Sequence, residues 1–294
     1  PRVAPPPWNE MYSGDNQPPL PPNFMPEHPF DNGDMMIRDE RLAGFPRQQD
    51  EILRHRADYY AMISHHDHHI GLVLDKLRES GQYDNTLIVF TSDHGLACGC
   101  HGLMGKENLY EHSARVPLII SGPGIPAGRR LDKSCVCGHY DFIPFLADYL
   151  GVTAPNTAEG VSYYNVVTGE EASARRDICA GYRDCMRMAT DGRFKLIYYP
   201  HLDRTQLFDL ANDPDETNDL MLPWRRYPES RYLPTTMGPG KTTYEPDPAP
   251  RDMGIANNPF YTPALPADEA DAAVERLRQV LVQWQESMKD PILV

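Results

Sequence analysis

Apolar positions recur at steps of three and four in three parts of the chain, which predicts three amphipathic helices. The longest covers residues 50–80, with a stripe from Leu53 to Leu77, and Gly81 is expected to end it. Asp67 lies on that stripe and is expected to tie the helix to a neighbouring loop. The second helix is predicted over residues 138–151 and the third over residues 268–289.

Short β-branched runs predict strands between and after these helices. Residues 86–91 have the composition of a strand buried on both faces, and a second strand follows at residues 116–121. Residues 185–189 and 194–199 flank an Asp-Gly turn, which predicts a β-hairpin, and residues 206–210 add a third strand. Helices and strands in this order predict an α/β protein.

Two proline-rich segments interrupt the pattern. Residues 1–49 hold 11 of the 29 prolines and have no apolar periodicity, so an extended segment along the surface is expected. Composition alone favours a disordered linker there. Residues 221–266 interleave prolines with arginines and aromatic residues. That stretch predicts packing or an inter-subunit arm, with contact to an anionic ligand as the alternative.

The charge and composition narrow the classes of partner. The chain has 294 residues, 40% of them hydrophobic, and a net charge of −14, which fits a globular protein and argues against nucleic acid or an anionic membrane as partner. No apolar run approaches the roughly 20 residues of a membrane span. The six cysteines predict free thiols or a single bridge, because their spacing does not match structural zinc sites.

The sequence Ser92-Asp93-His94-Gly95 directly follows the strand predicted at residues 86–91. Ligands in open α/β sheets bind beyond the carboxyl ends of the strands, and a carboxylate beside an imidazole suits a divalent metal. A simple turn after a strand is the alternative interpretation of Asp93 and His94.

A glycine-rich loop follows and ends at Lys106, which is positioned to hold an anion. The alternative for Lys106 is an exposed, solvated side chain. His101 lies inside this loop. It is expected either to be a third polar group over a bound substrate or to be an ordinary loop residue. Cys98, Cys100 and His101 form a rival zinc site, although thiolates seldom share an ion with hard oxygen ligands.

The run from His65 to His69 also suggests metal binding, because His65 and His69 are one helical turn apart. Both lie opposite the apolar stripe and are expected to face solvent. We therefore expect at most adventitious nickel or zinc binding there.

Three motifs in order, SDHG, GCHGLMGK and LYEHSARVPLIISGPGI, resemble the type I sulfatases of the alkaline phosphatase superfamily. The resemblance implies an α/β sandwich with a mixed central sheet flanked by helices and a smaller C-terminal antiparallel subdomain. It implies domains at residues 1–174 and 175–294. It also favours an ordered proline-rich segment, in which Arg38, Asp39 and Arg47 are candidates for positions near the site.

The resemblance further implies a sulfuric ester hydrolase acting on a sulfated carbohydrate or aryl ester. Its nucleophile is a formylglycine hydrate, expected in an N-terminal part of the same enzyme that precedes this chain. The expected roles are Asp93 and His94 as ligands of Ca²⁺ or Mg²⁺, Lys106 and His101 as catalytic residues, and both of these with Arg38 as substrate-binding residues.

The expected partners are that N-terminal part, a sulfated small molecule or glycan, and in some forms a second copy of the chain. The family implies a periplasmic, secreted or lysosomal location. Two alternatives stay open: a phosphodiesterase or phosphonate hydrolase of the same superfamily, and a noncatalytic binding chain that keeps the fold without the nucleophile.

Overall fold

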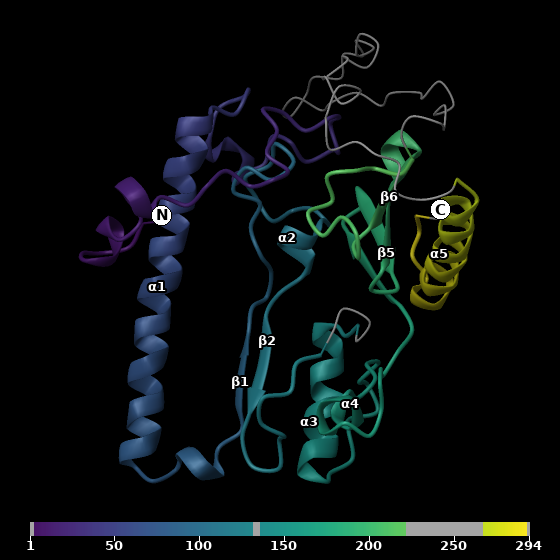
Figure 1. Ribbon diagram of the computed structural model, residues 1–294. Helices are drawn as coiled ribbons and strands as arrows, with labels where there is room; N and C mark the ends of the chain where they lie inside the picture. The colour runs from purple at the N-terminus through teal and green to yellow at the C-terminus, as the bar shows by residue number, and fades with distance from the viewer. Residues whose placement is uncertain (1–2, 132–135, 222–266, 293–294) are drawn as a thin grey trace. The chain divides into compact units, whose positions relative to one another are not determined.

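The computed structural model describes residues 3–131, 136–221 and 267–292. Figure 1 shows its helices and strands, coloured by residue number. Its contacts divide the chain into two compact units. The N-terminal unit contains residues 1–29, 36–106 and 115–127, and the C-terminal unit contains residues 30–35, 107–114 and 128–294. This division differs from the predicted domain boundary at residue 174, which stays a prediction. Residues 222–266, most of the second proline-rich segment, lie outside the described residues.

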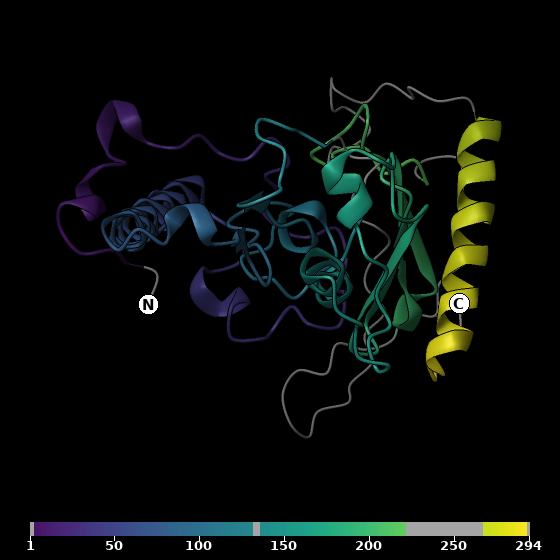
Figure 2. The same cartoon turned by 90° about the horizontal axis from the view of Figure 1, so that it is seen from below.

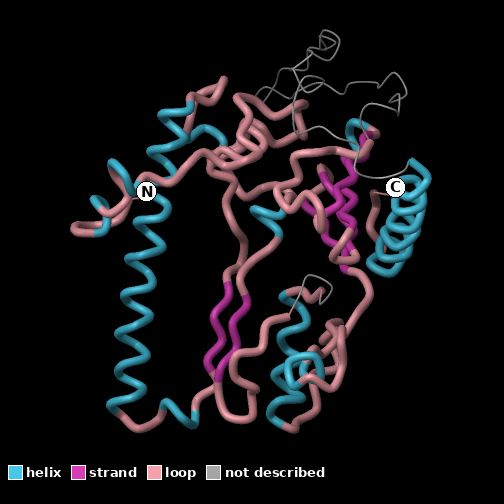
Figure 3. Tube along the Cα trace, viewed as in Figure 1, coloured by secondary structure: helices cyan, strands magenta, loops and turns pink. Residues whose placement is uncertain are grey.

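The N-terminal unit combines a long helix with a two-stranded sheet (Figure 3). The strands β1 (Ile88–Thr91) and β2 (Leu118–Ser121) are antiparallel, and Thr91 pairs with Leu118. The helices of this unit are η1 (Trp8–Glu10), η2 (Gly14–Asn16), η3 (Glu40–Leu42), α1 (Gln49–Glu79) and η4 (Tyr83–Asn85).

Helix α1 confirms the helix predicted over residues 50–80. Acidic residues in its first turn and basic residues in its last turn complement the helix dipole. Gly81, at φ +71°, follows its end. The predicted buried stripe was wrong in part, because Ile52 and Ala61 are its buried residues while Ile63 and Asp67 are exposed. Asp67 therefore lies in solvent and not against a neighbouring loop.

The strands β1 and β2 confirm the two predicted strands, but the expectation that the first is buried on both faces was wrong. Phe90 on β1 is exposed to 37%, and Ile119 on β2 to 60%. The reason is that, among the described residues, β1 and β2 pair only with each other. Composition reports a preference for burial, whereas the burial itself depends on what packs on the strand.

The C-terminal unit is built on a four-stranded antiparallel sheet in the order β3-β4-β5-β6. The strands are β3 (Ile178–Tyr182), β4 (Met186–Thr190), β5 (Phe194–Tyr199) and β6 (Arg204–Asp209). The helices of this unit are α2 (Glu111–Ala114), η5 (His139–Asp141), α3 (Phe142–Leu150), α4 (Tyr164–Thr168), η6 (Pro200–Leu202) and α5 (Ala267–Met288).

Helix α5 packs along this sheet (Figure 2). Leu277 and Leu281 of α5 and Leu196 and Leu207 of the sheet are fully buried in one apolar cluster. The predicted C-terminal helix, the hairpin and the third strand are thus confirmed. Strand β3 was not predicted.

Successive antiparallel strands place alternate turns at the same end of the sheet. The β3–β4 turn at residues 183–185 precedes β4, and the β5–β6 connection at residues 200–203 follows β5. Because β4 and β5 are antiparallel neighbours, these two connections lie at the same end of the sheet. None of the helices in the described part of the chain is long and apolar enough to cross a membrane.

Candidate active site

Asp93 and His94 stand directly beyond the end of β1, as predicted. The two side chains face each other, with Asp93 Oδ2 3.3 Å from His94 Nε2. The His94 amide donates to Asp93 Oδ1 over 2.9 Å, and this bond is the main cause that lowers the pKa of Asp93. The Ser92 hydroxyl donates to the His94 carbonyl over 2.8 Å. The turn therefore holds an ionised carboxylate beside an imidazole.

The ring of His94 is oriented by its own backbone. Its Nδ1 lies 3.0 Å from the Gly95 carbonyl oxygen, which can only accept, so Nδ1 carries a proton. In the neutral imidazole the lone pair is then on Nε2, which lies 3.3 Å from Asp93 Oδ2. Two acceptors that face each other are satisfied by a proton or by a cation between them.

The two residues fit part of a metal site. Carboxylate oxygens suit Ca²⁺ and Mg²⁺, whereas imidazole is more often a ligand of transition ions. In the part of the chain that the structure describes, Asp93 and His94 have no third His, Cys, Asp or Glu close enough to complete a three-ligand group. The pair can therefore hold one side of a divalent cation that takes further ligands elsewhere.

The glycine-rich loop from Gly95 to Lys106 folds back on itself. The Ala97 amide donates to the Gly105 carbonyl and the Gly99 amide to the Leu103 carbonyl, each over 2.8 Å. Gly102 has φ +73°, and a Cβ at this position would lie 2.4 Å from the Glu27 carbonyl carbon. Only glycine fits there, so the close approach of the loop to residues 27–28 depends on it.

A buried ion pair fixes the end of this loop. The Glu40 carboxylate accepts the amides of Met104 over 2.9 Å and Gly105 over 2.7 Å. Arg47 Nη2 lies 2.5 Å from Glu40 Oε2, and Arg47 Nε donates to the Gly102 carbonyl over 3.0 Å. Arg47 was predicted near the site, whereas Glu40 was not predicted. A carboxylate that binds backbone amides has no periodic signal in the sequence.

Lys106 follows this ion pair at the end of the loop, and its role in holding an anion stays a prediction. Its Nζ lies 2.6 Å from Asp39 Oδ2, and Arg38 Nε lies 2.7 Å from Asp39 Oδ1. These bonds, with Arg38 the larger influence, lower the pKa of Asp39 to about 2. Arg38 is mostly exposed, whereas Lys106 is 24% exposed. The lysine is thus a held, half-buried cation and not a freely solvated side chain.

His101 is buried inside the loop, with 5% of its surface exposed. Its backbone has φ +52°, its amide donates to the Asn23 carbonyl, and its Nε2 lies 3.1 Å from Asn23 Nδ2. These contacts hold the N-terminal segment against the loop. They give His101 a structural role, and its predicted catalytic role stays a prediction.

The rival metal sites do not form ligand groups in the described residues. Cys98, Cys100 and His101 are not gathered around one point. His65 and His69 do approach each other, with their Nε2 atoms 3.0 Å apart, and the ring of Trp8 lies over His65. No third ligand among the described residues completes this pair.

Two family models match the chain. The model described as Sulfatase matches residues 11–152, and the one described as N-sulphoglucosamine sulphohydrolase, C-terminal, matches residues 99–226. Together they cover both the candidate site and the β3–β6 sheet. The chain belongs to the sulfatase family.

Named sulfatases are among its relatives. It is 37% identical over 183 residues to a choline-sulfatase of Rhizobium meliloti, which is 60% of this chain and 35% of that protein. It is 34% identical over 176 residues to an N-acetylglucosamine-6-O-sulfatase of Bacteroides thetaiotaomicron, 55% of this chain and 31% of that protein. The matches thus extend over about a third of the relatives' length.

Solved structures agree with this family. BT4656 in complex with its substrate D-glucosamine-2-N,6-O-disulfate matches 86% of this chain and 45% of its own, with 26% identity and a TM-score of 0.62. A phosphonate monoester hydrolase of Agrobacterium radiobacter matches 75% of this chain and 50% of its own, with 25% identity and a TM-score of 0.60. This sulfatase-family chain has the predicted alkaline-phosphatase-like α/β fold.

Proposed function

We propose that the enzyme to which this chain belongs hydrolyses sulfate esters, and that the chain supplies two metal ligands and a held cation to the active site. The observation that carries the proposal is the pair Asp93 and His94 at the end of β1, with facing acceptor atoms 3.3 Å apart. The relatives named as sulfatases support the same reaction class.

Asp93 and His94 bind a divalent cation, with Ca²⁺ expected and Mg²⁺ as the alternative. When bound, such a cation acts as a Lewis acid that draws charge from the sulfate oxygens. Asp93 contributes a carboxylate oxygen, and the bond from His94 Nδ1 to Gly95 leaves Nε2 free to contribute the nitrogen. The net charge of −14 makes a local positive centre necessary for any anionic substrate.

Lys106 is the second positive group of the proposed site. Asp39 holds its ammonium, which then donates a hydrogen bond to an oxygen of the sulfate or of the leaving group. A fixed donor needs little reorganisation as negative charge develops on those oxygens. Arg38, which is exposed, contacts the anionic part of the substrate. His101, which is buried in the glycine-rich loop, is the second catalytic and substrate-binding residue of the proposed site.

The proposal assigns the nucleophile, a formylglycine hydrate, to sequence outside these 294 residues. The proposed substrate of the enzyme is a sulfated carbohydrate. One similar structure holds D-glucosamine-2-N,6-O-disulfate, and one relative is named as an N-acetylglucosamine-6-O-sulfatase. Choline and aryl sulfates are the other candidates. A periplasmic, secreted or lysosomal location and a homo-oligomer stay predictions.

The test is an assay of the complete enzyme against sulfated glucosamine, an aryl sulfate and choline sulfate, with and without a chelator and added Ca²⁺. Asp93→Asn and Lys106→Ala should each lower kcat by about 100-fold or more, the usual effect of removing one group that stabilises the transition state. Asp15→Asn, which changes an exposed carboxylate, should leave kcat unchanged. Full activity of both active-site variants would sink the proposal.

A phosphonate monoester hydrolase is the second candidate, because two such enzymes resemble the chain at 25% and 28% identity. Both reactions can use a similar metal shell, so the assay includes a phosphonate monoester. A kcat/KM higher for the phosphonate than for every sulfate would favour this candidate. Absence of turnover for all of these substrates would favour the noncatalytic binding chain.

A further inference from the structure

Three metal-ligating side chains gather at one end of the β3–β6 sheet: Asp184, Cys185 and His201. Of the residues described here, only these form a group of three or more whose ligand atoms all lie within 4.8 Å of one another. Asp184 and Cys185 belong to the turn before β4, and His201 belongs to η6 after β5. The strand order brings these distant positions to the same end of the sheet.

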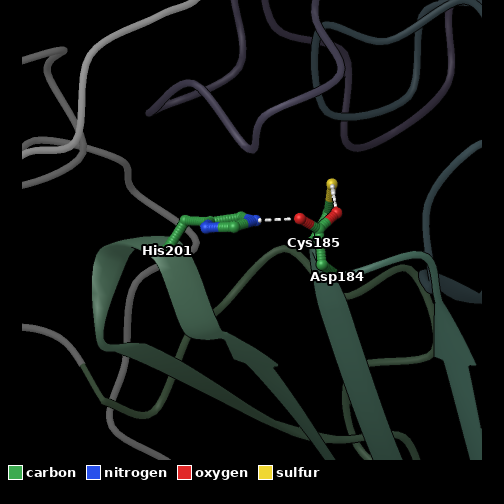
Figure 4. A group of neighbouring side chains, drawn as sticks. All are labelled: Asp184, Cys185 and His201. Atoms are coloured by element: carbon green, nitrogen blue, oxygen red, sulfur yellow. Dashed lines mark hydrogen bonds and ion pairs between the residues drawn. The ribbon is translucent and has the colours of Figure 1, made fainter. Parts of the chain in front are cut away.

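The Asp184 carboxylate lies between His201 and Cys185, with one oxygen toward each of them (Figure 4). His201 Nε2 lies 3.0 Å from Asp184 Oδ2, and Cys185 Sγ lies 3.5 Å from Asp184 Oδ1. Cys185 is buried, whereas His201 and Asp184 are 40% and 60% exposed. An ion from solvent can therefore reach a thiol that is otherwise enclosed.

A backbone wall closes one side of this cluster. Gly33 has φ +96°, and a Cβ there would lie 3.3 Å from Cys185 Sγ and 4.0 Å from His201 Cδ2. Phe30 anchors the segment that carries Gly33. Its ring packs edge-on against the ring of Tyr199, with the two ring centroids 4.8 Å apart. The ligand atoms thus sit under a fixed chain and not in a loose surface loop.

The charges around the cluster also suit a cation. Asp34 is mostly buried and is close enough to raise the pKa of Cys185 electrostatically, although burial is the main cause. Arg183 Nη1 lies 3.1 Å from Asp34 Oδ1 and offsets part of this charge. His201, Asp184 and Cys185 then face one another with one carboxylate charge among them.

We propose that Asp184, Cys185 and His201 form a binding site for Zn²⁺ that joins the β3–β4 and β5–β6 hairpins. Zinc takes thiolate, imidazole and carboxylate together, whereas Ca²⁺ and Mg²⁺ take oxygen ligands. A set of one sulfur, one nitrogen and one oxygen therefore selects the borderline-soft ion. The site uses none of the residues assigned to sulfate hydrolysis, so it does not depend on that proposal.

The three ligand atoms lie within 4.8 Å of one another, so zinc binding requires the side chains to rotate toward one point. Zinc–ligand bonds of about 2.0–2.3 Å in a tetrahedral site put the ligand atoms roughly 3.3–3.6 Å apart. The Nε2–Oδ2 and Sγ–Oδ1 distances are 3.0 Å and 3.5 Å, but they involve the two different oxygens of Asp184. Rotation of exposed side chains can adjust the remaining spacing. The fourth position is left for water or another small ligand.

Binding of Zn²⁺ releases one proton, from the Cys185 thiol. Without metal, Cys185 is a thiol that donates to Asp184 Oδ1. On binding, the sulfur–hydrogen bond breaks, its electron pair forms the zinc–sulfur bond, and the proton leaves to solvent. His201 binds as neutral imidazole through Nε2, and Asp184 as carboxylate. The ion then links two hairpins that are otherwise joined at this end by side-chain hydrogen bonds.

The first test measures zinc affinity by competition with a chromophoric chelator. The background variant is His65→Gln/His69→Gln in the full chain, which removes the histidine pair on α1. This variant should bind one Zn²⁺, and His201→Gln or Cys185→Ser added to it should weaken binding by at least 10- to 100-fold. The controls are His139→Gln, another exposed histidine, and Cys179→Ser, another buried thiol.

The second test uses Co²⁺ as a probe and thermal unfolding as a check of folding. Co²⁺ in the background variant should give a thiolate-to-metal absorption that Cys185→Ser abolishes and Cys179→Ser retains. Zn²⁺ should raise the Tm of the background variant and not that of His201→Gln, an exposed substitution that should leave the metal-free Tm unchanged. Equal zinc affinity in background and His201→Gln, or no thiolate absorption, would overturn the assignment.

Discussion

Lys106 Nζ lies 2.6 Å from Asp39 Oδ2, so the predicted anion-holding lysine is itself held by a carboxylate. Asp39 is 5% exposed and also bonds Arg38. Because these partners lower the pKa of Asp39 to about 2, the carboxylate stays ionised at every pH above that value. Its stabilising contribution is complete above pH 3.8 and is lost as the pH falls toward 2.

Asp39→Asn tests whether this contact positions Lys106 for catalysis. The variant loses a charge-assisted hydrogen bond of about 1.5–3 kcal/mol, which corresponds to a roughly 10- to 100-fold fall in kcat/KM of the complete enzyme. Asp15→Asn makes the same chemical change at an exposed position and should have no effect. An unchanged kcat/KM in Asp39→Asn would show that the lysine does not need this partner.

Glu40→Gln tests the buried pair that fixes the glycine-rich loop. The substitution leaves the Arg47 guanidinium, which is fully buried, without its carboxylate. Removing one partner of a buried ion pair costs about 3–5 kcal/mol, so the free energy of unfolding should fall by that amount. Chemical denaturation measures the loss, with Glu10→Gln, an exposed glutamate, as the control. Equal denaturation midpoints for the two variants would contradict a stabilising role of the Glu40–Arg47 ion pair.

The sequence predicted those elements whose signal is local. Helix α1, helix α5 and the hairpin of β4 and β5 follow from apolar spacing and from the Asp-Gly turn, and all three are present. The placement of Asp93 and His94 beyond a strand followed from the sequence, because a position after a strand end depends on adjacent residues, and their role as metal ligands stays a prediction. The resemblance of the motifs added the family and the expected reaction.

Long-range features were not predictable in the same way. Glu40 contacts Met104 and Gly105 across more than sixty residues, and neither end carries a pattern that names the other. His201 and Cys185 meet only because β4 and β5 are neighbours in the sheet. Strand β3 was missed because its sequence, ICAGY, has a glycine and a short apolar run.

Gly102→Ala tests the close approach of the loop to residues 27–28. A left-handed residue with a Cβ costs roughly 1–2 kcal/mol, and a Cβ 2.4 Å from backbone adds a steric cost of roughly 1–3 kcal/mol. Gly81→Ala is a matched control, because Gly81 has φ +71° and open space around its Cβ. Gly102→Ala should therefore lower the unfolding free energy more than Gly81→Ala. Equal losses would mean that the loop moves freely away from residues 27–28.

Glu216 predicts a pH dependence of stability in the C-terminal unit. Its carboxylate is buried beside Lys195, at 3.0 Å, and accepts the Glu111 amide over 2.7 Å. Burial is the largest influence and raises the pKa of Glu216 from 4.5 to about 7. The folded state therefore binds a proton more tightly than the unfolded state does. The associated stability is complete below pH 4.5 and is lost as the pH rises through about 7.

The measurement compares wild type with Glu216→Gln by chemical denaturation across this pH range. Glutamine does not titrate, so the difference in unfolding free energy should change by about 3 kcal/mol between pH 4.5 and 7, with the wild type losing stability. Asp219, whose pKa burial raises to about 6, titrates in both proteins and cancels in the difference. Lys195 keeps Glu111 as a partner in the variant, at 3.0 Å. Parallel stability curves would show that Glu216 is ionised throughout, with the attraction of Lys195 outweighing its burial.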